Sequence, residues 1–320
     1  MKLLHVFSVW LALLSGIFTG PALAQSVTPV CADPAASMLW EVSGAGLGNK
    51  GVSIQLFGSL HVGKPEFYPL PDLIEDTFRS ADHLVFEIDP TSATDPQTAM
   101  LMQERGMLPA GQTLQNVVSP EAYATLQQVL TSMGLPAASV NNFKPWLVAL
   151  MLTNLQVSAL GYSALDGLEM YFTTRKSPQS DILELESIDQ QLAMLDSLNP
   201  DMFLGYSLED LQEGAVELEK MVQAWRCADQ DQLSAFMFDD FNNTQSLPLA
   251  EQAKLKELHQ LLFAERNVVM VNGIEQFIRN GKGAYFVVVG SGHLLGQGSV
   301  VELLRARGYE VTSVRLPARL

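Results

Sequence analysis

The 320-residue sequence has few basic residues, and this shortage excludes a class of partner. Lysine and arginine together number 19, against 35 aspartates and glutamates, and the formal net charge is −16. Basic residues this few and this scattered cannot form the positive stripe with which proteins bind nucleic acids or anionic membranes. We therefore expect no nucleic-acid partner, and we interpret the acidity as a solubility feature that says little about mechanism.

Long apolar runs are also missing, apart from one at the N-terminus. Residues 1–24 combine a positive Lys2, a mostly apolar segment and the small-x-small sequence Ala22-Leu23-Ala24, a pattern typical of a cleaved export signal. The apolar segment is shorter than the roughly 20 residues of a membrane span, which disfavours a retained anchor. We predict a mature chain of residues 25–320 that makes no stable membrane insertion and is periplasmic or secreted. Loss of Lys2 would change its net charge from −16 to −17.

Cysteine is scarce as well, since Cys31 and Cys227 are the two in the chain. Export to an oxidising compartment favours a disulfide between them, and the alternative is two unpaired thiols. A disulfide would join the N-terminal segment to a helix far along the chain. Paired cysteines would also leave no thiolate for a Cys-His mechanism.

Short apolar runs alternate with segments of helical periodicity. The runs at 84–88, 182–185, 284–289 and 310–314 have the form of buried strands, and 38–42 with 53–57 resembles a hairpin around the turn at 44–51. Helical spacing covers 70–80, 120–133, 145–160, 190–198, 208–225, 251–280 and 300–307. We predict one α/β domain over residues 25–320. Its central sheet comes from the N- and C-terminal parts, with a mainly helical insertion at about 96–280.

Four histidines follow the predicted signal, and two of them stand in matching contexts. His61 closes Gly58-Ser59-Leu60-His61 after one predicted strand, and His293 closes Gly290-Ser291-Gly292-His293 after another. In both places the glycine permits a tight exit from the strand, and the histidine follows on the loop. Open α/β sheets bind their ligands at the carboxyl ends of strands, where both histidines are expected.

Two carboxylates also stand at the ends of predicted strands, because Glu87 and Glu186 each lie at the end of an apolar run typical of a buried strand. An isolated buried carboxylate is costly, so each needs a partner. Two imidazoles with one or two carboxylates suit a divalent metal, and the donor types do not decide between Mn, Co and Zn. Such a metal would lower the pKa of a bound water and polarise a carbonyl, while a carboxylate that is not a ligand takes the proton.

Other interpretations of these residues stay open. Each histidine and glutamate could be an ordinary hydrogen-bonding loop residue, and Gly290-Ser291-Gly292 could form an anion-binding nest, although no lysine follows it. Ser59 and Ser291 neighbour histidines but stand in no Gly-x-Ser-x-Gly elbow. We expect His83 and His259 to be surface residues without a role in the site.

Several motifs together resemble the TraB/GumN family. They begin with Phe57-Gly58-Ser59-Leu60-His61-Val62-Gly63 and Phe86-Glu87-Ile88-Asp89 and end with Val289-Gly290-Ser291-Gly292-His293-Leu294. Between them lie Lys144-Pro145-Trp146, Leu165-Asp166, Leu185-Glu186 and Arg266-Asn267, and the similarity spans about residues 38–316. The resemblance implies an α/β fold related to erythromycin-esterase and ChaN-like proteins, and kinship with the Tiki metal-dependent proteases.

The same resemblance implies a site built from His61, Glu87, Glu186 and His293. Arg266 would be an oxyanion or substrate-carboxylate partner, or alternatively a buried ion pair that supports the site. We predict an exported divalent-metal-dependent hydrolase that cleaves peptides or another small-molecule substrate. The alternatives are a non-catalytic binding or regulatory protein that captures a peptide, haem or metal, and a scaffold that binds partners through its helical middle, for example through the apolar stretch 146–160.

Overall fold

The structure is a computed structural model that describes residues 31–44, 47 and 51–317. The predicted export signal lies outside the described residues, as does most of the predicted turn at 44–51. Within the described ranges, no helix is both long and apolar enough to cross a membrane.

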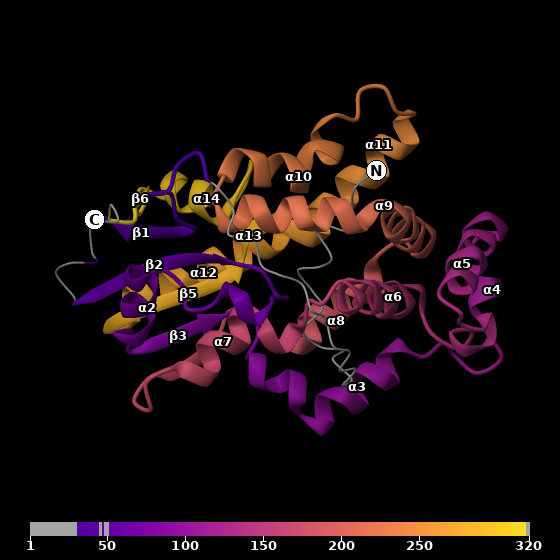
Figure 1. Cartoon of the computed structure of the whole chain (residues 1–320), viewed down its shortest axis with the longest axis horizontal. Helices are drawn as coiled ribbons and strands as arrows, with labels where there is room; N and C mark the ends of the chain where they lie inside the picture. The colour runs from indigo at the N-terminus through magenta and orange to yellow at the C-terminus, as the bar shows by residue number, and fades with distance from the viewer. Residues whose placement is uncertain (1–30, 45–46, 48–50, 318–320) are drawn as a thin grey trace.

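Six strands form one mixed sheet in the order β4-β3-β5-β2-β1-β6 (Figure 1). Their bounds are β1 Leu39–Ser43, β2 Val52–Ser59, β3 His83–Phe86, β4 Asp181–Glu184, β5 Gly283–Gly290 and β6 Glu310–Ser313. β2, β5, β3 and β4 are parallel, whereas β1 pairs antiparallel with both β2 and β6. The predicted α/β fold is therefore confirmed, with the two ends of the chain forming most of the sheet and the helical middle contributing β4.

The register of β2 against β5 determines where the two strands end. β5 is central and buried, and its residues Phe286, Val287 and Val288 have no exposed surface, as expected of a parallel strand covered on both faces. The pairing continues to Ser59 opposite Gly290. The two Gly-x-x-His segments consequently leave the sheet side by side, at the carboxyl ends of the adjacent strands β2 and β5.

Ten helical segments precede β4 in the described part of the chain, and those from α3 onward form the first part of the helical middle. The ten are η3 Pro65–Phe67, α2 Asp72–Arg79, η4 Pro90–Thr94, α3 Pro96–Gly106, α4 Leu114–Val117, α5 Pro120–Ser132, η5 Ala137–Ser139, α6 Pro145–Ala159, η6 Ala164–Asp166 and α7 Leu168–Arg175. The apolar helix α6 is buried along most of its length, including Trp146 and Val148, so its hydrophobicity belongs to the core.

The helices after β4 complete the molecule. They are α8 Ile188–Ser197, α9 Pro200–Arg226, α10 Gln230–Asn242, α11 Leu249–His259, the π-helix η7 Gln260–Ala264, α12 Glu265–Asn280, α13 Ser291–Leu294 and α14 Val300–Ala306. α9 starts eight residues before the predicted position because Asn199 caps it through Met202 N–H, with Pro200 in the first turn. The predicted helix at 251–280 is present but contains the π-turn. The helices α3, α4, α7, α10 and α13 were not predicted.

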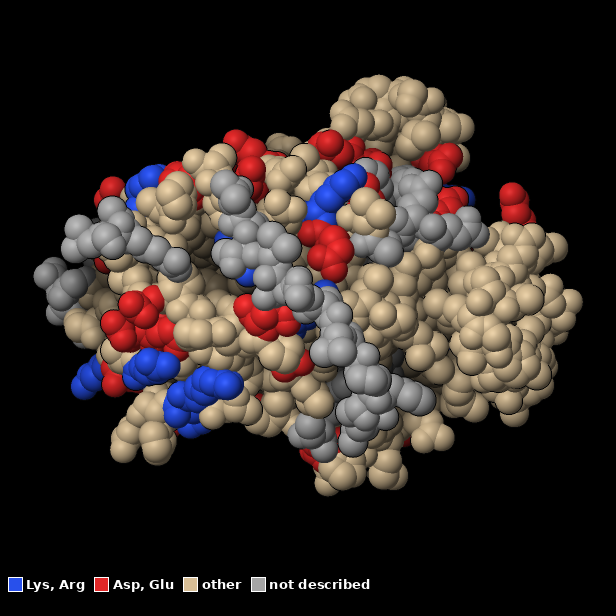
Figure 2. Space-filling view, viewed as in Figure 1, with Lys and Arg blue, Asp and Glu red and all other residues tan. Residues whose placement is uncertain are grey.

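The molecule has two ends of different character. Figure 1 places the sheet at one end and α4 and α5 at the other. On the face seen in Figure 2, the α4–α5 end shows almost no charged side chains, while charges gather toward the sheet end. The sequence gives the reason, because residues 107–143 contain one charged residue, Glu121.

The predicted disulfide between Cys31 and Cys227 is present. Cys227 directly follows α9, and two residues earlier the indole N–H of Trp225 donates to the carbonyl of Gly58 over 2.8 Å. The covalent link therefore holds the start of the described chain to the end of a helix that contacts the first Gly-x-x-His segment.

Candidate active site

The two Gly-x-x-His segments are joined to each other directly. The Ser291 hydroxyl donates to the Ser59 carbonyl over 2.9 Å. Both glycines belong to the strands, because β2 continues to Ser59 and β5 to Gly290, whereas we predicted shorter strands. A Cβ on Gly58 would lie 2.9 Å from Met38 Cε and 3.0 Å from Ser291 Oγ, so this glycine serves close packing between the segments.

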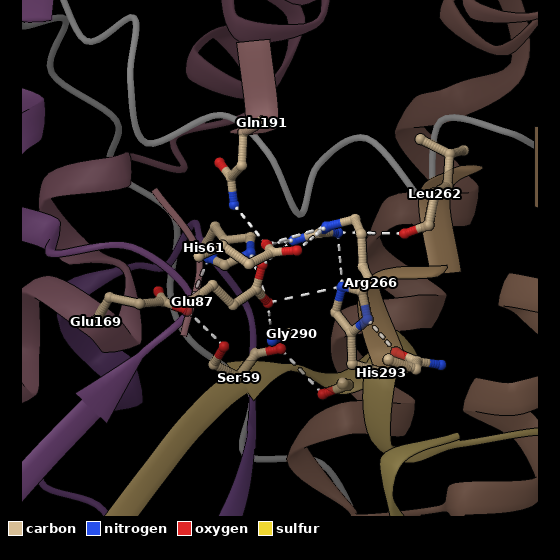
Figure 3. Close-up of polar contacts among 12 residues, drawn as sticks. Ser59, His61, Glu87, Glu169, Gln191, Leu262, Arg266, Gly290 and His293 are labelled. Atoms are coloured by element: carbon tan, nitrogen blue, oxygen red, sulfur yellow. Dashed lines mark hydrogen bonds and ion pairs between the residues drawn. The ribbon is translucent and has the colours of Figure 1, made fainter. Parts of the chain in front are cut away.

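His61 is buried and held by a carboxylate. Its Nδ1 lies 2.7 Å from Glu169 Oε1, and the same oxygen accepts the Ser59 hydroxyl at 2.5 Å (Figure 3). A carboxylate only accepts, so Nδ1 carries the proton. Nε2 then points to the other side of the ring, where Glu87 Oε1 lies at 4.0 Å.

His293 is 1% exposed and is held in the same way by an amide. Its Nδ1 lies 2.6 Å from Asn267 Oδ1, while Asn267 Nδ2 donates to the Gly298 carbonyl at 2.9 Å and thereby sets which amide atom faces the ring. Nδ1 is therefore the protonated nitrogen, and Nε2 lies 3.8 Å from Glu87 Oε1. Both imidazoles thus direct Nε2 toward one carboxylate oxygen.

Glu87 and Glu186 are brought together by the β3–β4 pair. Backbone pairing continues past both strands, since Glu186 N–H donates to the Glu87 carbonyl at 2.8 Å. Glu87 Oε1 accepts the Gly290 N–H at 2.6 Å, and Glu186 Oε2 accepts from Gln191 Nε2 at 3.1 Å. Both side chains are buried, with 5% and 6% of their surface exposed.

Arg266 lies at the centre of this cluster (Figure 3). Its Nε donates to Glu186, and its Nη2 lies 2.6 Å from both Glu87 Oε2 and Glu186 Oε2. Its Nη1 lies 3.2 Å from the Leu262 carbonyl and 2.8 Å from His293 Nε2. A guanidinium has five N–H donors, and these contacts use all of them. This arrangement is the buried ion pair of our alternative interpretation, and it leaves no donor for an oxyanion.

The π-turn η7 explains how Arg266 reaches this position. In this turn Glu265 N–H reaches back five residues to the Gln260 carbonyl, so the helix is locally wider than an α-helix. The Leu262 carbonyl at its centre accepts the Arg266 guanidinium. π-turns of this kind often occur at functional sites, and here the turn connects α11 to the helix that carries Arg266 and Asn267.

The two histidines of the cluster differ in the direction in which their surroundings shift the pKa. Burial and, after it, the Arg266 cation together lower the pKa of His293 to about 3, so this ring is neutral. Burial also lowers the pKa of His61, but the Glu169 carboxylate outweighs it and the net pKa is raised above 6.5. Burial opposes ionisation of Glu87, yet the Arg266 cation and the hydrogen bond from the Gly290 N–H hold the pKa of this carboxyl below its usual range.

The donor set suits a divalent metal in kind. It offers two imidazole Nε2 atoms and one carboxylate oxygen, and each Nδ1 is held by an oxygen acceptor, which is how proteins orient imidazole ligands. Two features differ from a preformed site. Arg266 Nη1 occupies the His293 Nε2 lone pair. Among residues 31–44, 47 and 51–317, no group of three or more His, Cys, Asp or Glu side chains is close enough to hold an ion.

The other serines and histidines considered in the sequence analysis either lie away from the cluster or have their hydroxyl protons engaged in other hydrogen bonds. Ser59 and Ser291 donate their hydroxyl protons to Glu169 and to a carbonyl, so neither proton goes to a histidine as a nucleophilic serine requires. His83 stacks on Tyr285 at the beginning of β3, at the far end of the strand from Glu87. His259 is half-buried among phenylalanines, which differs from the surface position that we expected.

Sequence reasoning missed three residues that hold the site, namely Glu169, Gln191 and Asn267. Glu169 lies in the first turn of α7, where an acidic residue is expected for helix stability alone. Gln191 lies in α8 as an ordinary polar helix residue. Asn267 stands beside Arg266 in a motif that we noted, but nothing in the sequence indicates that its side chain holds His293.

Comparison with known proteins identifies a family model and several sequence relatives. The sequence model of the TraB/PrgY/gumN family matches residues 38–313. The protein YbaP of Escherichia coli strain K12, described as uncharacterized, is 27% identical over 254 residues, which is 78% of this chain and 87% of YbaP. No solved structure matches the chain significantly.

Two further relatives are named metalloproteases. TIKI2 of Xenopus tropicalis is 26% identical over 308 residues, covering 80% of this chain and 57% of TIKI2. TIKI1 of Homo sapiens is 24% identical over 302 residues, covering 80% and 58%. The matches therefore span little more than half of each Tiki protein. Because the family model covers most of the sequence, including both Gly-x-x-His segments, the chain belongs to the TraB/PrgY/gumN family.

Proposed function

We propose that this chain is an exported, divalent-metal-dependent peptidase. The observation that carries the proposal is the pair of buried histidines, each with Nδ1 held by an oxygen acceptor and Nε2 directed at the same Glu87 oxygen. The metalloprotease relatives support peptide hydrolysis. The N-terminal pattern of residues 1–24 and the Cys31–Cys227 disulfide support export to the periplasm or the extracellular space.

His61, His293 and Glu87 would hold the ion, and Mn, Co and Zn all suit these donors. When bound, such an ion lowers the pKa of a water and polarises the scissile carbonyl. Use of His293 requires that its Nε2 give up the hydrogen bond from Arg266. Glu186, predicted as a ligand from the sequence, is instead paired with Arg266 on both oxygens.

Other residues of the site would orient the ligands and take a proton. Glu169 and Asn267 hold the two imidazoles in the tautomer that presents Nε2. Gly290 N–H orients Glu87. Glu186 is the carboxylate left to take a proton from the attacking water, and Arg266 with Gln191 positions it.

A second function has an observation of its own in its favour. Arg266 neutralises the cluster with all its donors engaged, so the residues form a satisfied network without an ion. Of the alternatives from the sequence, this favours a non-catalytic binding or regulatory protein that captures a peptide or haem, not one that captures a metal. The two functions differ in whether an ion enters the cluster.

The deciding experiment is metal content by mass spectrometry on the mature protein after reloading with Mn, Co or Zn. We expect near-stoichiometric metal in the parent, little in the His61→Ala/His293→Ala double variant, and the parent level in a control in which His83, remote from the cluster, is changed to alanine. Peptidase activity should disappear on chelation and return with the ion. A parent without metal after reloading would refute the enzyme and favour the binding protein.

A further inference from the structure

A pocket of about 230 Å³ opens beside the candidate site, between α8 and the π-turn with α12. Glu186 and Arg266 form its inner wall, so it borders the residues proposed to activate water. Clefts that hold a whole drug-sized ligand measure about 300–1,000 Å³. This pocket is smaller and matches one substrate side chain rather than a complete substrate.

The pocket has an apolar part, formed by Met194 from α8, Leu261 from the π-turn and Val269 from α12. Gln190, Gln191 and Ser197 of α8 add uncharged polar groups to the lining. Val269 is 39% exposed, so part of this apolar lining is open to solvent. The apolar part favours a side chain with a methylene stem, because its burial removes apolar surface from water.

The charged residues that line the pocket favour a ligand side chain with a positively charged end. Glu186 and the exposed Glu265 both line the pocket, and the one guanidinium among the lining residues, Arg266, is shared with a third carboxylate, Glu87. All five Arg266 donors are engaged, so the guanidinium offers no N–H to an anionic ligand. An excess of carboxylate near the mouth attracts cations and repels anions.

We infer that this pocket is a specificity subsite for a basic side chain, which would place a lysine- or arginine-like residue of the peptide next to the cluster. The methylene stem would lie against Met194, Leu261 and Val269, and the cationic head would face Glu265 at the mouth and the Glu186 side of the inner wall. This assignment rests on the proposed peptidase function for its biological meaning. The binding that it describes requires neither an ion nor turnover.

The test is a titration of the intact mature protein, labelled with ¹³C in its methionine methyl groups, with Nα-acetyl-lysine methylamide. The Met194→Leu variant, which keeps the side-chain volume, assigns the Met194 signal. We expect a saturable shift of that signal, a weaker response to the norleucine analogue, and none to the glutamate analogue. Salt should weaken the lysine response, because the attraction at an exposed carboxylate is screened.

The variant Glu265→Gln should weaken binding of the lysine compound about two- to fivefold, the range expected for an exposed ion pair. Glu257→Gln, an exposed carboxylate on α11 outside the pocket, is the matched control and should bind as the parent does. Equal affinity for the three compounds, or an unmoved Met194 signal at the highest soluble concentration, would overturn the subsite.

The subsite and the proposed function can fail separately. A metal-free, inactive protein that prefers the lysine compound would keep the pocket and refute the peptidase. An active, metal-loaded enzyme with equal kcat/KM for peptides that differ only by lysine, norleucine or glutamate at any position would keep the peptidase and refute the pocket.

Discussion

Arg266 is the residue on which the charge balance of the site depends. It is 6% exposed and lies between two buried carboxylates, Glu87 and Glu186. Breaking a buried pair by removing one partner leaves uncompensated charge and costs about 3–5 kcal/mol. We expect Arg266→Met to lower the free energy of unfolding by about this amount, measured by urea denaturation of the mature protein.

The matched control is Arg279→Met, because Arg279 is 60% exposed and 3.8 Å from its partner Glu275. Surface pairs contribute roughly 0–1 kcal/mol, so this variant should change little. Adding Glu87→Gln and Glu186→Gln to Arg266→Met should recover part of the loss, because the uncompensated charges are then gone. Equal losses in the two arginine variants would show that the buried cluster does not depend on Arg266.

Glu169 acts on the site through His61, whose Nδ1 it holds at 2.7 Å. Loss of an outer partner of a metal-binding histidine lowers metal affinity about 10- to 100-fold. We expect this loss for Glu169→Gln in competition titrations with a chelating dye, because the amide holds the imidazole less strongly. Glu219→Gln, which removes an exposed partner of Lys64, should keep the parent affinity. Parent affinity in Glu169→Gln would rule out a positioning role.

At the scale of elements, the helix pair α10 and α11 encloses His259. Its ring lies 5.3 Å from Phe241 and 5.6 Å from Phe263, and the second of these rings lies 5.4 Å from His293. Burial lowers the pKa of His259 below 6.5. The unfolded chain therefore binds a proton more readily, and the stability contributed by the neutral ring is present above pH 6.5 and lost as the pH falls below it.

The corresponding experiment compares the parent with His259→Phe in urea unfolding between about pH 8 and pH 5, the range in which histidine titrates. The parent should lose more stability than the variant across the lower half of this range. Identical slopes in parent and His259→Phe would contradict the burial effect.

Elements also show where sequence periodicity was sufficient. All six predicted strands are present. The sequences of β3 and β5 are apolar because these central strands are mostly buried, whereas the edge strands β4 and β6 are more exposed than a prediction of buried strands implied. The helical prediction over 251–280 covered α11 and α12 but not the π-turn between them. One extra residue in a helical turn changes the facing of the side chains while leaving the apolar pattern almost intact, so periodicity does not reveal it.

For the molecule as a whole, the disulfide closes a loop between Cys31 and Cys227, which are 196 residues apart. Removing a native disulfide costs typically about 2–5 kcal/mol, since the unfolded chain gains freedom. We expect reductant to lower the free energy of unfolding by that order. The Cys31→Ser/Cys227→Ser variant should already show the loss and should not respond to reductant. A parent that is equally stable with and without reductant would refute the contribution.

The chain by itself determined the α/β class, the central sheet built from its two ends, the disulfide partners and the two Gly-x-x-His segments. Each of these depends on local pattern or on residue scarcity, such as apolar runs, two cysteines and a glycine three residues before a histidine. Glu87 and Glu186 were also identified locally, because a carboxylate at the end of a buried strand needs a partner.

Only the tertiary structure decided what those residues do together. The parallel register of β2 and β5 places His61 and His293 together at the carboxyl ends of these strands. The fold brings Glu169 and Asn267 to them from α7 and α12, and no sequence pattern pairs either residue with a histidine. The tertiary structure also places the Arg266 guanidinium between Glu87 and Glu186, where it forms an ion pair with each carboxylate. The physical reason is that hydrogen bonds and ion pairs form between atoms close in space, whereas sequence patterns report the burial of one element at a time.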